Sequence, residues 1–191
     1  MKITKRQSKA IITGELSITF KDLLKNVVID SDQRILIGPM QDPVVFFSDF
    51  FYSYPETKVD WLPSLFDYNH EFLEEIIETI KRKFSSRVNI LCKDLLMRED
   101  YYDLIITNPP YSTYTNSQGK KVANPTQLFI DKLEPMMKVN GSLISLLRAA
   151  DLACGAKAGK LIQKALTIKE IHFSSNNFGF KDITTEVAAI I

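Results

Sequence analysis

Short apolar runs recur along the chain, and turn-forming or charged residues bound each of them. The runs are rich in β-branched and aromatic side chains, which is typical of buried strands. Seven segments fit this description: Arg34–Gly38, Thr57–Leu62, Val88–Cys92, Tyr102–Thr107, Gly141–Leu147, Thr167–Phe173 and Glu186–Ile191. The pattern therefore predicts seven strands spread along the chain.

Amphipathic patterns of helical period lie between some of these segments. Apolar residues recur at spacings of three and four over Phe72–Phe84, which predicts a helix with one buried face. A second helix is expected to start after Asn124, because Pro125 suits the first helical position and Gln127 completes a capping box. Pro135 is expected to end or kink that helix.

Strands that alternate with helices predict an α/β protein, in which a doubly wound, mainly parallel sheet lies between two layers of helices. Ligands of such sheets bind at the carboxyl ends of the strands, near the point where the strand order reverses. The residues that directly follow each strand are therefore the leading candidates for function.

One such segment is Asn108-Pro109-Pro110-Tyr111, which follows the strand Tyr102–Thr107. The two prolines fix two backbone φ angles and remove two N–H donors, and the first proline restricts Asn108 to extended geometry. The free polar groups of this stiff segment are therefore mostly acceptors, and an aromatic ring follows them. A rigid turn can use the same residues, but their position at a carboxyl edge favours a binding site.

An acceptor-rich site beside an aromatic ring suits a flat substrate that carries an amino or amide nitrogen. The lone pair of an exocyclic amine is delocalised into its ring, so the nitrogen is a poor nucleophile. Two acceptors that hold its two hydrogens favour a more tetrahedral nitrogen with a localised lone pair. Tyr111 can stack on the ring while Asn108 and nearby carbonyls hold the amine.

The segment Asn108–Tyr111 resembles the catalytic motif of amino-group methyltransferases that use S-adenosylmethionine, above all the DNA adenine-N6 methyltransferases of restriction–modification systems. The resemblance extends over Asn89–Leu95, Gln127–Leu133, Asn140–Ser145 and Phe180–Ile191. It implies S-adenosylmethionine as the cofactor, DNA with an adenine target as the partner, and the seven-stranded, mainly parallel sheet of class I methyltransferases with an antiparallel last strand.

The resemblance also assigns roles around the target base. Asn108 and the carbonyl of Pro109 would hold the amine, within a segment that Pro110 helps to keep rigid. Tyr111 and Phe180 would stack on the base.

For the cofactor, the resemblance implies contacts with five residues: Gly38, Asp60, Asp94, Leu95 and Asn108. Asp60 corresponds to the acid that grips the ribose hydroxyls in the family, and Asp94 corresponds to the acid near the cofactor's adenine.

The chain departs from the family at the cofactor loop after the first strand. The family has an acid, a proline and two glycines there, and the glycines let the backbone pass close under the cofactor. Here Pro39 and the later Phe46 match, but Gly38 replaces the acid, and Asp42 and Val44 occupy the glycine positions. A β-branched valine resists positive φ, and both side chains would take space that the ligand needs. Two explanations stay open: a diverged loop that still binds the cofactor, or a fold that has lost it.

The segment Ser112–Asn124 after the motif is polar and contains glycine, Lys120 and Lys121. It is predicted to be a loop that closes over a target nucleotide and touches phosphate. A solvated loop without a function is the alternative.

Composition limits these readings. With 24 basic and 23 acidic side chains among 191 residues, the net charge is +1, which gives no general attraction to nucleic acid. No apolar run has the length of a membrane helix. The presence of only two cysteines favours a reducing, cytoplasmic location. The two histidines lie too far apart in the sequence to suggest a metal site.

Residues 1–191 are expected to form a single catalytic core without a target-recognition domain, so that recognition depends on a separate domain or subunit.

The leading hypothesis is methyl transfer from S-adenosylmethionine to the N6 amine of adenine in DNA. A catalytically silent methyltransferase-like module that binds nucleic acid or a protein partner is the alternative, because the cofactor loop is degenerate. A methyltransferase that acts on a protein glutamine or on an RNA amino group is a further alternative, because an amide or amine nitrogen suits the same acceptors.

Overall fold

The computed structural model of the protein describes residues 24, 27–40, 43–63, 73–91, 101–108, 113–116, 118–123, 125–148, 171–173 and 187–190. Within these residues it contains one seven-stranded sheet and a separate two-stranded hairpin.

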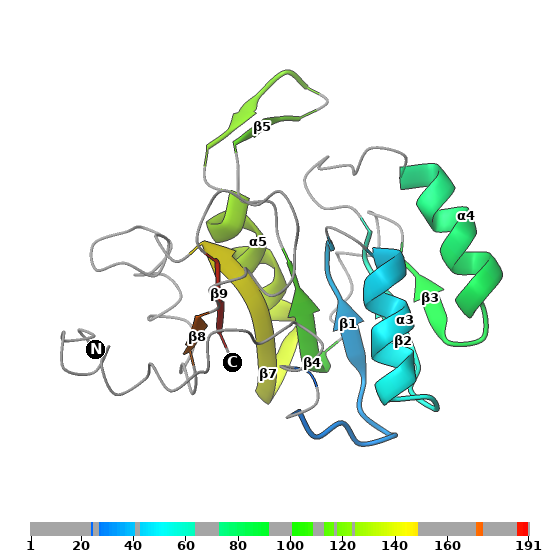
Figure 1. The fold of residues 1–191 in the computed structure, drawn as a ribbon. Helices are drawn as coiled ribbons and strands as arrows, with labels where there is room; N and C mark the ends of the chain where they lie inside the picture. The colour runs from blue at the N-terminus through cyan, green and yellow to red at the C-terminus, as the bar shows by residue number, and fades with distance from the viewer. Residues whose placement is uncertain are drawn as a thin grey trace.

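The large sheet consists of the strands β1 (Ile35–Ile37), β2 (Val59–Trp61), β3 (Val88–Ile90), β4 (Tyr102–Thr107), β7 (Met137–Arg148), β8 (Ile171–Phe173) and β9 (Val187–Ile190). Their spatial order is β3-β2-β1-β4-β7-β9-β8 (Figure 1). Neighbouring strands from β3 to β7 are parallel, whereas β9 is antiparallel to both β7 and β8. The predicted doubly wound, mainly parallel sheet with an antiparallel last strand is confirmed.

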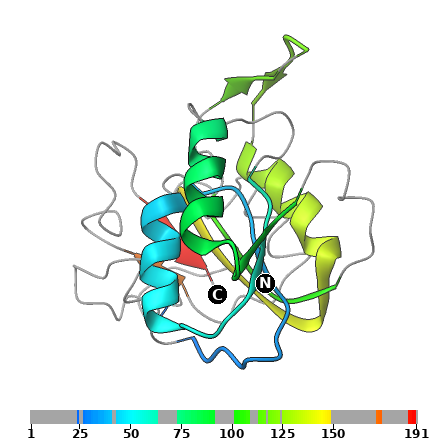
Figure 2. The same ribbon diagram turned by 90° about the vertical axis from the view of Figure 1, so that its right-hand side faces the viewer.

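Helices cover both faces of the sheet. Figure 2 shows α3 (Pro43–Ser53) and α4 (Leu73–Phe84) on one face and α5 (Pro125–Leu133) on the other. The helices α4 and α5 lie in the ranges that the sequence pattern predicts, and Pro135 falls in the 3-10 turn η2 (Glu134–Met136) that follows α5. No helix was predicted at α3, because its apolar residues are too dense to show a helical period.

The aromatic residues of α3 form the core between this helix and the sheet. Phe47 is fully buried and packs edge-on against Trp61 of β2, with the ring centroids 5.4 Å apart. Phe47 also stacks on Phe51 at 5.8 Å, and Phe51 contacts Phe84 of α4 at 5.4 Å. Each such aromatic pair contributes about 0.5–1.5 kcal/mol to stability, in addition to the contribution from the surface area that the two rings bury. This aromatic layer therefore fixes α3 and α4 on β2.

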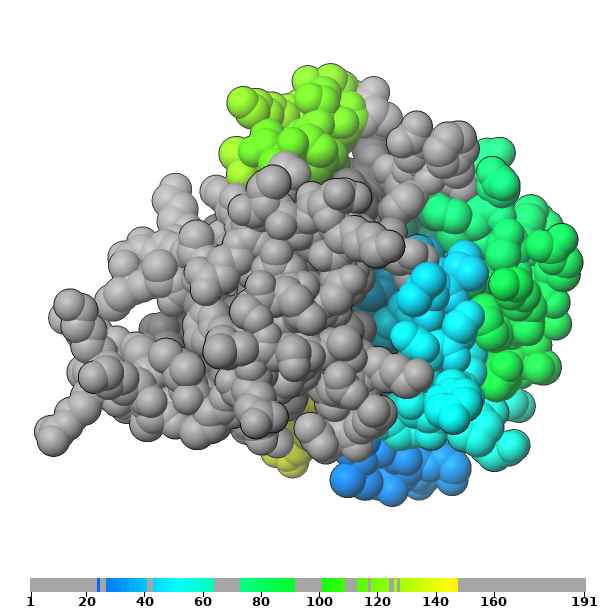
Figure 3. All heavy atoms as spheres, in the orientation of Figure 1, coloured from blue at the N-terminus to red at the C-terminus, as the bar shows by residue number. Residues whose placement is uncertain are grey.

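The polar loop predicted over Ser112–Asn124 contains a β-hairpin instead. The strand β5 (Tyr114–Thr115) pairs antiparallel with β6 (Lys121–Val122). The hairpin projects from the edge of the sheet where β1 and β4 end (Figure 1), and it protrudes from the surface of the protein (Figure 3).

Side-chain hydrogen bonds form the turn of the hairpin. The Asn116 side-chain oxygen accepts the N–H of Gln118 at 3.1 Å and the N–H of Lys120 at 2.8 Å. Gly119 has a φ of 73°, a value that favours glycine. Asparagine and glycine are typical turn residues, so the signal for this hairpin was present, although strands of two residues are too short to show an alternating pattern.

A charged network joins three strands at the opposite, amino edge of the sheet. Asp103 of β4 accepts the backbone N–H of Arg34, the residue before β1, at 2.9 Å. Lys138 of β7 donates to both carboxylate oxygens of Asp103, at 2.8 and 2.9 Å. The bond from Lys138, followed by that from the Arg34 backbone, lowers the pKa of the Asp103 carboxyl below its ordinary value.

We expect Asp103 to make the folded state sensitive to acid. Because its pKa is lower in the folded than in the unfolded chain, its stabilising effect is complete at neutral pH and is lost as the pH falls through the folded-state pKa. Asp103→Asn should therefore be less stable than the wild type at neutral pH, and the difference should shrink in acid. Urea unfolding at a series of pH values measures both effects. Lys138→Met should behave in the same way, and parallel pH profiles of wild type and Asp103→Asn would contradict this role.

Candidate functional site

The strand order reverses between β1 and β4, so the carboxyl ends of these two strands form the switch point at which doubly wound sheets bind ligands. The chain leaves β1 at Gly38 and leaves β4 at Asn108. Backbone bonds join the two exits: the Gly38 N–H donates to the Ile106 carbonyl at 2.8 Å, and the Asn108 N–H donates to the Pro39 carbonyl at 3.0 Å. The pairing of β1 with β4 thus continues past both strands and holds Asn108 beside the segment after β1.

Gly38 allows this close approach. A Cβ at this position would lie 2.7 Å from Thr107 Oγ1 and 2.9 Å from Thr107 Cβ, closer than unbonded atoms tolerate. The Thr107 hydroxyl in turn donates to the Pro39 carbonyl at 3.4 Å. This packing role is separate from the cofactor contact expected of Gly38, which stays a prediction.

Asn108 itself is 4% exposed. Burial of an amide side chain is unfavourable unless the amide is hydrogen-bonded, so a buried asparagine at a ligand-binding edge indicates a specific polar role. Of the residues expected to act with Asn108, Gly38 lies next to it across the β1–β4 junction. Asp60 lies in β2 and is described below, whereas six further residues lie outside the described part of the chain: Pro109, Pro110, Tyr111, Asp94, Leu95 and Phe180.

Two buried hydroxyls that the sequence did not single out lie toward the same edge. Ser145 of β7 is fully buried and pairs with Thr107 in the strand register. Thr126 is 2% exposed in the first turn of α5, which begins below the hairpin (Figure 1). Neither hydroxyl has a hydrogen-bond partner in the part of the chain that the structure describes. The one available sequence signal was a serine inside the apolar run Gly141–Leu147.

The structure corrects one expectation about the cofactor loop. Val44 lies in the first turn of α3, where the backbone is helical, so no positive φ is required of it. Its partly buried side chain packs against the hydrophobic core. Asp42, the other residue at a glycine position of the family, lies outside the described residues. The start of α3 therefore occupies this part of the loop.

Asp60 lies in the middle of β2, where it pairs with Leu36 of β1. By the same register Leu62 lies level with Gly38, and the Leu62 N–H donates to the Ile37 carbonyl at 2.8 Å. Asp60 thus lies two residues inside the carboxyl edge, roughly 7 Å along the strand.

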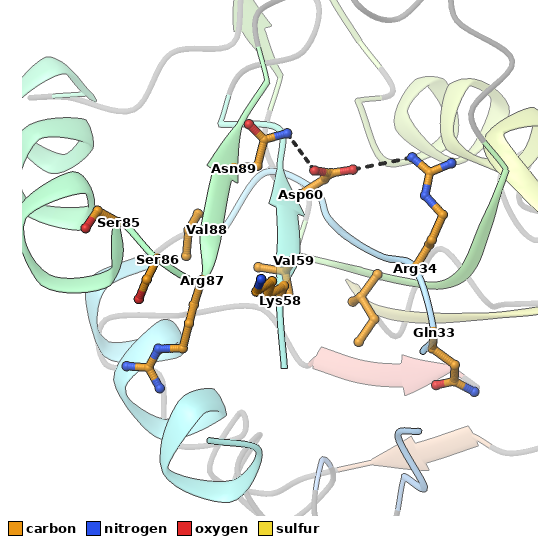
Figure 4. Close-up of a pocket in the computed structure, with 11 residues that line it drawn as sticks. Gln33, Arg34, Lys58, Val59, Asp60, Ser85, Ser86, Arg87, Val88 and Asn89 are labelled. Carbon is orange, nitrogen blue, oxygen red and sulfur yellow. Dashed lines mark hydrogen bonds and ion pairs between the residues drawn. The ribbon is translucent and has the colours of Figure 1, made fainter. Parts of the chain in front are cut away.

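The carboxylate of Asp60 has partners from neighbouring strands. It accepts a bond from Asn89 Nδ2 at 2.7 Å and a bond from the Tyr102 hydroxyl at 2.8 Å. The Arg34 guanidinium lies 3.8 Å away on the same side (Figure 4). Arg34 and Tyr102 lie at the amino ends of β1 and β4, so two of the three partners of Asp60 come from the edge opposite Asn108. The ribose contact expected of Asp60 stays a prediction.

The two lysines of the polar segment, Lys120 and Lys121, are exposed on the hairpin. Among the described residues, no helix is long and apolar enough to cross a membrane. The same residues contain no group of three or more side chains suited to hold a metal ion.

Known proteins resemble this chain in structure, although no protein-family model and no curated protein matches its sequence. A protein from Listeria monocytogenes described as a class I S-adenosylmethionine-dependent methyltransferase shares 17% identity over 89% of this chain, with a TM-score of 0.65. A type I restriction–modification methyltransferase subunit from Streptococcus thermophilus shares 16% identity over 93% of this chain, with a TM-score of 0.59. Fibrillarin from Aeropyrum pernix, crystallised with S-adenosylmethionine, shares 12% identity over 90% of this chain, with a TM-score of 0.57. The chain has the class I methyltransferase fold.

These neighbours are longer than this chain. The chain spans 56% of the Listeria protein, 44% of the Streptococcus subunit and 73% of the Aeropyrum fibrillarin. Because the sequence identities are below 20%, the similarity to these proteins establishes the class I methyltransferase fold and nothing more. Chemistry must therefore be argued from the residues of this chain.

We expect Asp60→Ala to destabilise the protein by about 1–3 kcal/mol, because the buried Tyr102 hydroxyl would lose its acceptor. Urea unfolding gives the free energy of unfolding for the variant and the wild type. Tyr102→Phe is the matched control, since it removes the donor together with the need for an acceptor, and it should cost less. An unchanged stability of Asp60→Ala would show that these bonds do not support the fold.

Proposed function

We propose that the protein transfers a methyl group from S-adenosylmethionine to the exocyclic N6 amine of adenine in DNA. The observation that carries the proposal is the position of Asn108, which is buried at the switch point and bonded through its backbone to the segment after β1. An Asn-Pro-Pro-Tyr segment that starts there offers acceptors to an amine at the place where this fold binds ligands. The restriction–modification subunit from Streptococcus thermophilus among the structural neighbours supports the same class of target.

In this proposal the chain prepares the amine for attack. The side-chain oxygen of Asn108 and the carbonyl of Pro109 accept the two amine hydrogens, which draws the nitrogen lone pair out of the ring. The rigid Pro109-Pro110 pair keeps both acceptors in place, and Tyr111 and Phe180 stack on the two faces of the base. Because these groups are held before the substrate arrives, little reorganisation is needed in the transition state.

S-adenosylmethionine supplies an electrophilic methyl group when it is bound. The described residues fit such a ligand in one respect: Thr126 Oγ1 and Ser145 Oγ are buried toward the carboxyl edge without partners in the described part of the chain. In the proposal Gly38 and Asn108 border the cofactor at the junction of β1 and β4. Asp94 and Leu95 contact its adenine, and Asp60 is the candidate for its ribose.

A separate domain or subunit would supply recognition of the DNA sequence. The chain spans 44% of the restriction–modification subunit that it resembles, and its net charge of +1 gives no general attraction to DNA. The hairpin is an exception, because its local charge is positive. From Leu104 to Ile130 the sequence contains Lys120 and Lys121 and no acidic residue, so the proposal assigns these two lysines to the phosphates beside the target base.

We expect Asn108→Ala to lower methyl transfer at least about 100-fold, because one of the two acceptors for the amine is removed. Transfer of radiolabelled methyl groups from S-adenosylmethionine to the N6 position of adenine in plasmid DNA measures the change. The backbone bond from residue 108 to Pro39 does not need the side chain, so the thermal unfolding transition should remain cooperative. An active Asn108→Ala enzyme would refute the assigned role.

Calorimetric titration of the wild-type chain with S-adenosylmethionine tests the cofactor separately from DNA. Binding to the wild type, weaker but still detectable binding to Asn108→Ala because Asn108 also borders the cofactor, and transfer only by the wild type are the results expected for an active enzyme. Absence of heat at millimolar ligand would overturn the proposed activity. It would favour a methyltransferase-like module that binds nucleic acid or protein without catalysis. That second candidate rests on the start of α3, which places Val44 and not a glycine next to the cofactor loop.

We expect the double variant Lys120→Ala/Lys121→Ala to bind duplex DNA more weakly and with a weaker salt dependence. Each lost phosphate contact lowers the slope of log K against log salt by about 0.9, so the slope should fall by about 2. Fluorescence anisotropy over a range of salt concentrations gives both slopes. Lys81→Ala/Lys83→Ala removes the same charge from exposed positions on α4 and should leave the slope unchanged. Equal effects of the two double variants would remove the hairpin from the proposed DNA surface.

A further inference from the structure

The hairpin of β5 and β6 stands apart from the large sheet. Among the described strands, β5 and β6 pair only with each other, and the hairpin protrudes at the edge where β4 ends (Figures 1 and 3). β5 starts six residues after Asn108, a length of chain that spans at most about 20 Å. One turn of a DNA duplex is about 34 Å long, so the hairpin starts within one turn of a base held at Asn108.

The turn of the hairpin is fixed by four hydrogen bonds. The Asn116 N–H donates to the Lys120 carbonyl at 3.0 Å, and the Gly119 N–H donates to the Asn116 carbonyl at 2.9 Å. The Asn116 side-chain oxygen accepts the N–H groups of Gln118 and Lys120. With Gly119 at positive φ, this is a three-residue loop closed by a glycine bulge. A tip with a preset shape loses little entropy when it binds a partner.

The two lysines of the hairpin lie on opposite faces of its two-stranded ribbon. Lys121 pairs with Thr115, and the backbone bond from Asn116 to Lys120 extends the pairing by one residue. Because successive side chains of a strand point to opposite faces, Lys120 and Lys121 point to different sides. They are therefore suited to two separate anions, one on each side of the ribbon, and not to a single phosphate.

The tip of the hairpin is polar and accessible. Gln118 and Gly119 are exposed, and the Gln118 side chain takes no part in the bonds that form the turn. Apart from the chain neighbours of Gly119, no atom lies within 4 Å of the position that a Cβ would take there, so the space beside the tip is open. The tip thus presents one amide side chain to a partner.

The dimensions of the ribbon fit the major groove of DNA. A sheet with side chains on both faces is about 10 Å thick, whereas the major groove is about 12 Å wide and the minor groove about 6 Å. The strand from Tyr114 to Asn116 and the turn beyond it span roughly 10 Å, which exceeds the groove depth of about 8.5 Å. Each wall of this groove is a phosphate backbone, so a ribbon inside it meets one backbone on each face.

We infer that the hairpin enters the major groove of DNA beside the target base and that Gln118 reads an adenine there. The inference rests on the proposed function for the identity of its partner, DNA. A glutamine amide can form two bonds with an adenine, at N6 and N7, while Lys120 and Lys121 contact the phosphates of the two strands. The chain then contributes part of the sequence recognition itself, in addition to that of a separate domain or subunit.

A duplex whose major groove is filled tests the position of the hairpin. Glucosylated 5-hydroxymethylcytosine in place of cytosine puts glucose into the major groove and leaves the phosphates unchanged. In fluorescence anisotropy we expect the full chain to bind this duplex at least about tenfold more weakly than the unmodified duplex. Equal affinity for the two duplexes, or no binding of DNA, would overturn the inference. Equal affinity for an RNA duplex of the same sequence would also overturn it, because the major groove of RNA is too narrow for side chains to read.

This binding experiment involves no methyl transfer, so the two proposals can fail separately. Binding that depends on an open major groove, in a chain without transfer activity, would support the hairpin and refute the proposed reaction. Methyl transfer by a chain that binds both duplexes equally would support the reaction and refute the hairpin.

Gln118→Ala tests the contact with the base. Selection of bound duplexes from a random library should show that the wild type enriches adenine about tenfold at a position where Gln118→Ala shows no preference. The turn should persist in the variant, because its bonds use Asn116 and the backbone. Gln33→Ala removes a glutamine beside β1 at the opposite edge of the sheet and should retain the preference. The same adenine enrichment by the wild type and Gln118→Ala would overturn the role of Gln118, as would the absence of enrichment by the wild type.

Discussion

Gly38 has no side chain, and Thr107 occupies the space where one would lie. This close contact lets β1 and β4 continue their pairing beyond their last residues, so the Pro39 carbonyl can accept the N–H of Asn108. The two central strands also mark the reversal of strand order, and every other element is placed outward from them. The candidate site therefore depends on a packing constraint: its asparagine is held by the same junction that holds the sheet together.

Much of the fold could be predicted because local pattern and tertiary structure agree. The run Tyr102–Thr107 is apolar and β-branched, and it became the strand β4 with four fully or nearly buried residues after its start. The helix α4 followed from its three- and four-residue spacing. α3 could not be predicted in the same way, because phenylalanine at so many positions hides the helical period. The hairpin was missed for the opposite reason, since two-residue strands carry no period at all and its turn depends on one asparagine side chain.

The residues of the candidate site also differ in whether the sequence could predict them. Asn108 could be predicted because a motif follows a recognisable strand, and the structure places it at the switch point. The burial of Ser145 and Thr126 could not, because a hydroxyl in a sequence does not reveal which strand or helix will cover it. Asp60 was predicted from its correspondence to the family's ribose-binding acid, yet strand register decides how far from the edge a side chain lies.

The Arg34–Asp103 bond joins residues that are 69 positions apart. Closing a loop of that length costs chain entropy before the contacts inside it can repay the cost, so sheets with such distant pairings fold slowly. The junction of Gly38 with Thr107 and Asn108 closes a loop of similar size. During synthesis, a growing chain that has emerged only as far as β3 has no partner on the β4 side of β1. The asparagine that the proposed chemistry needs thus acquires its surroundings only after the central strands have met, and the order of chain growth makes the candidate site one of the later features to assemble.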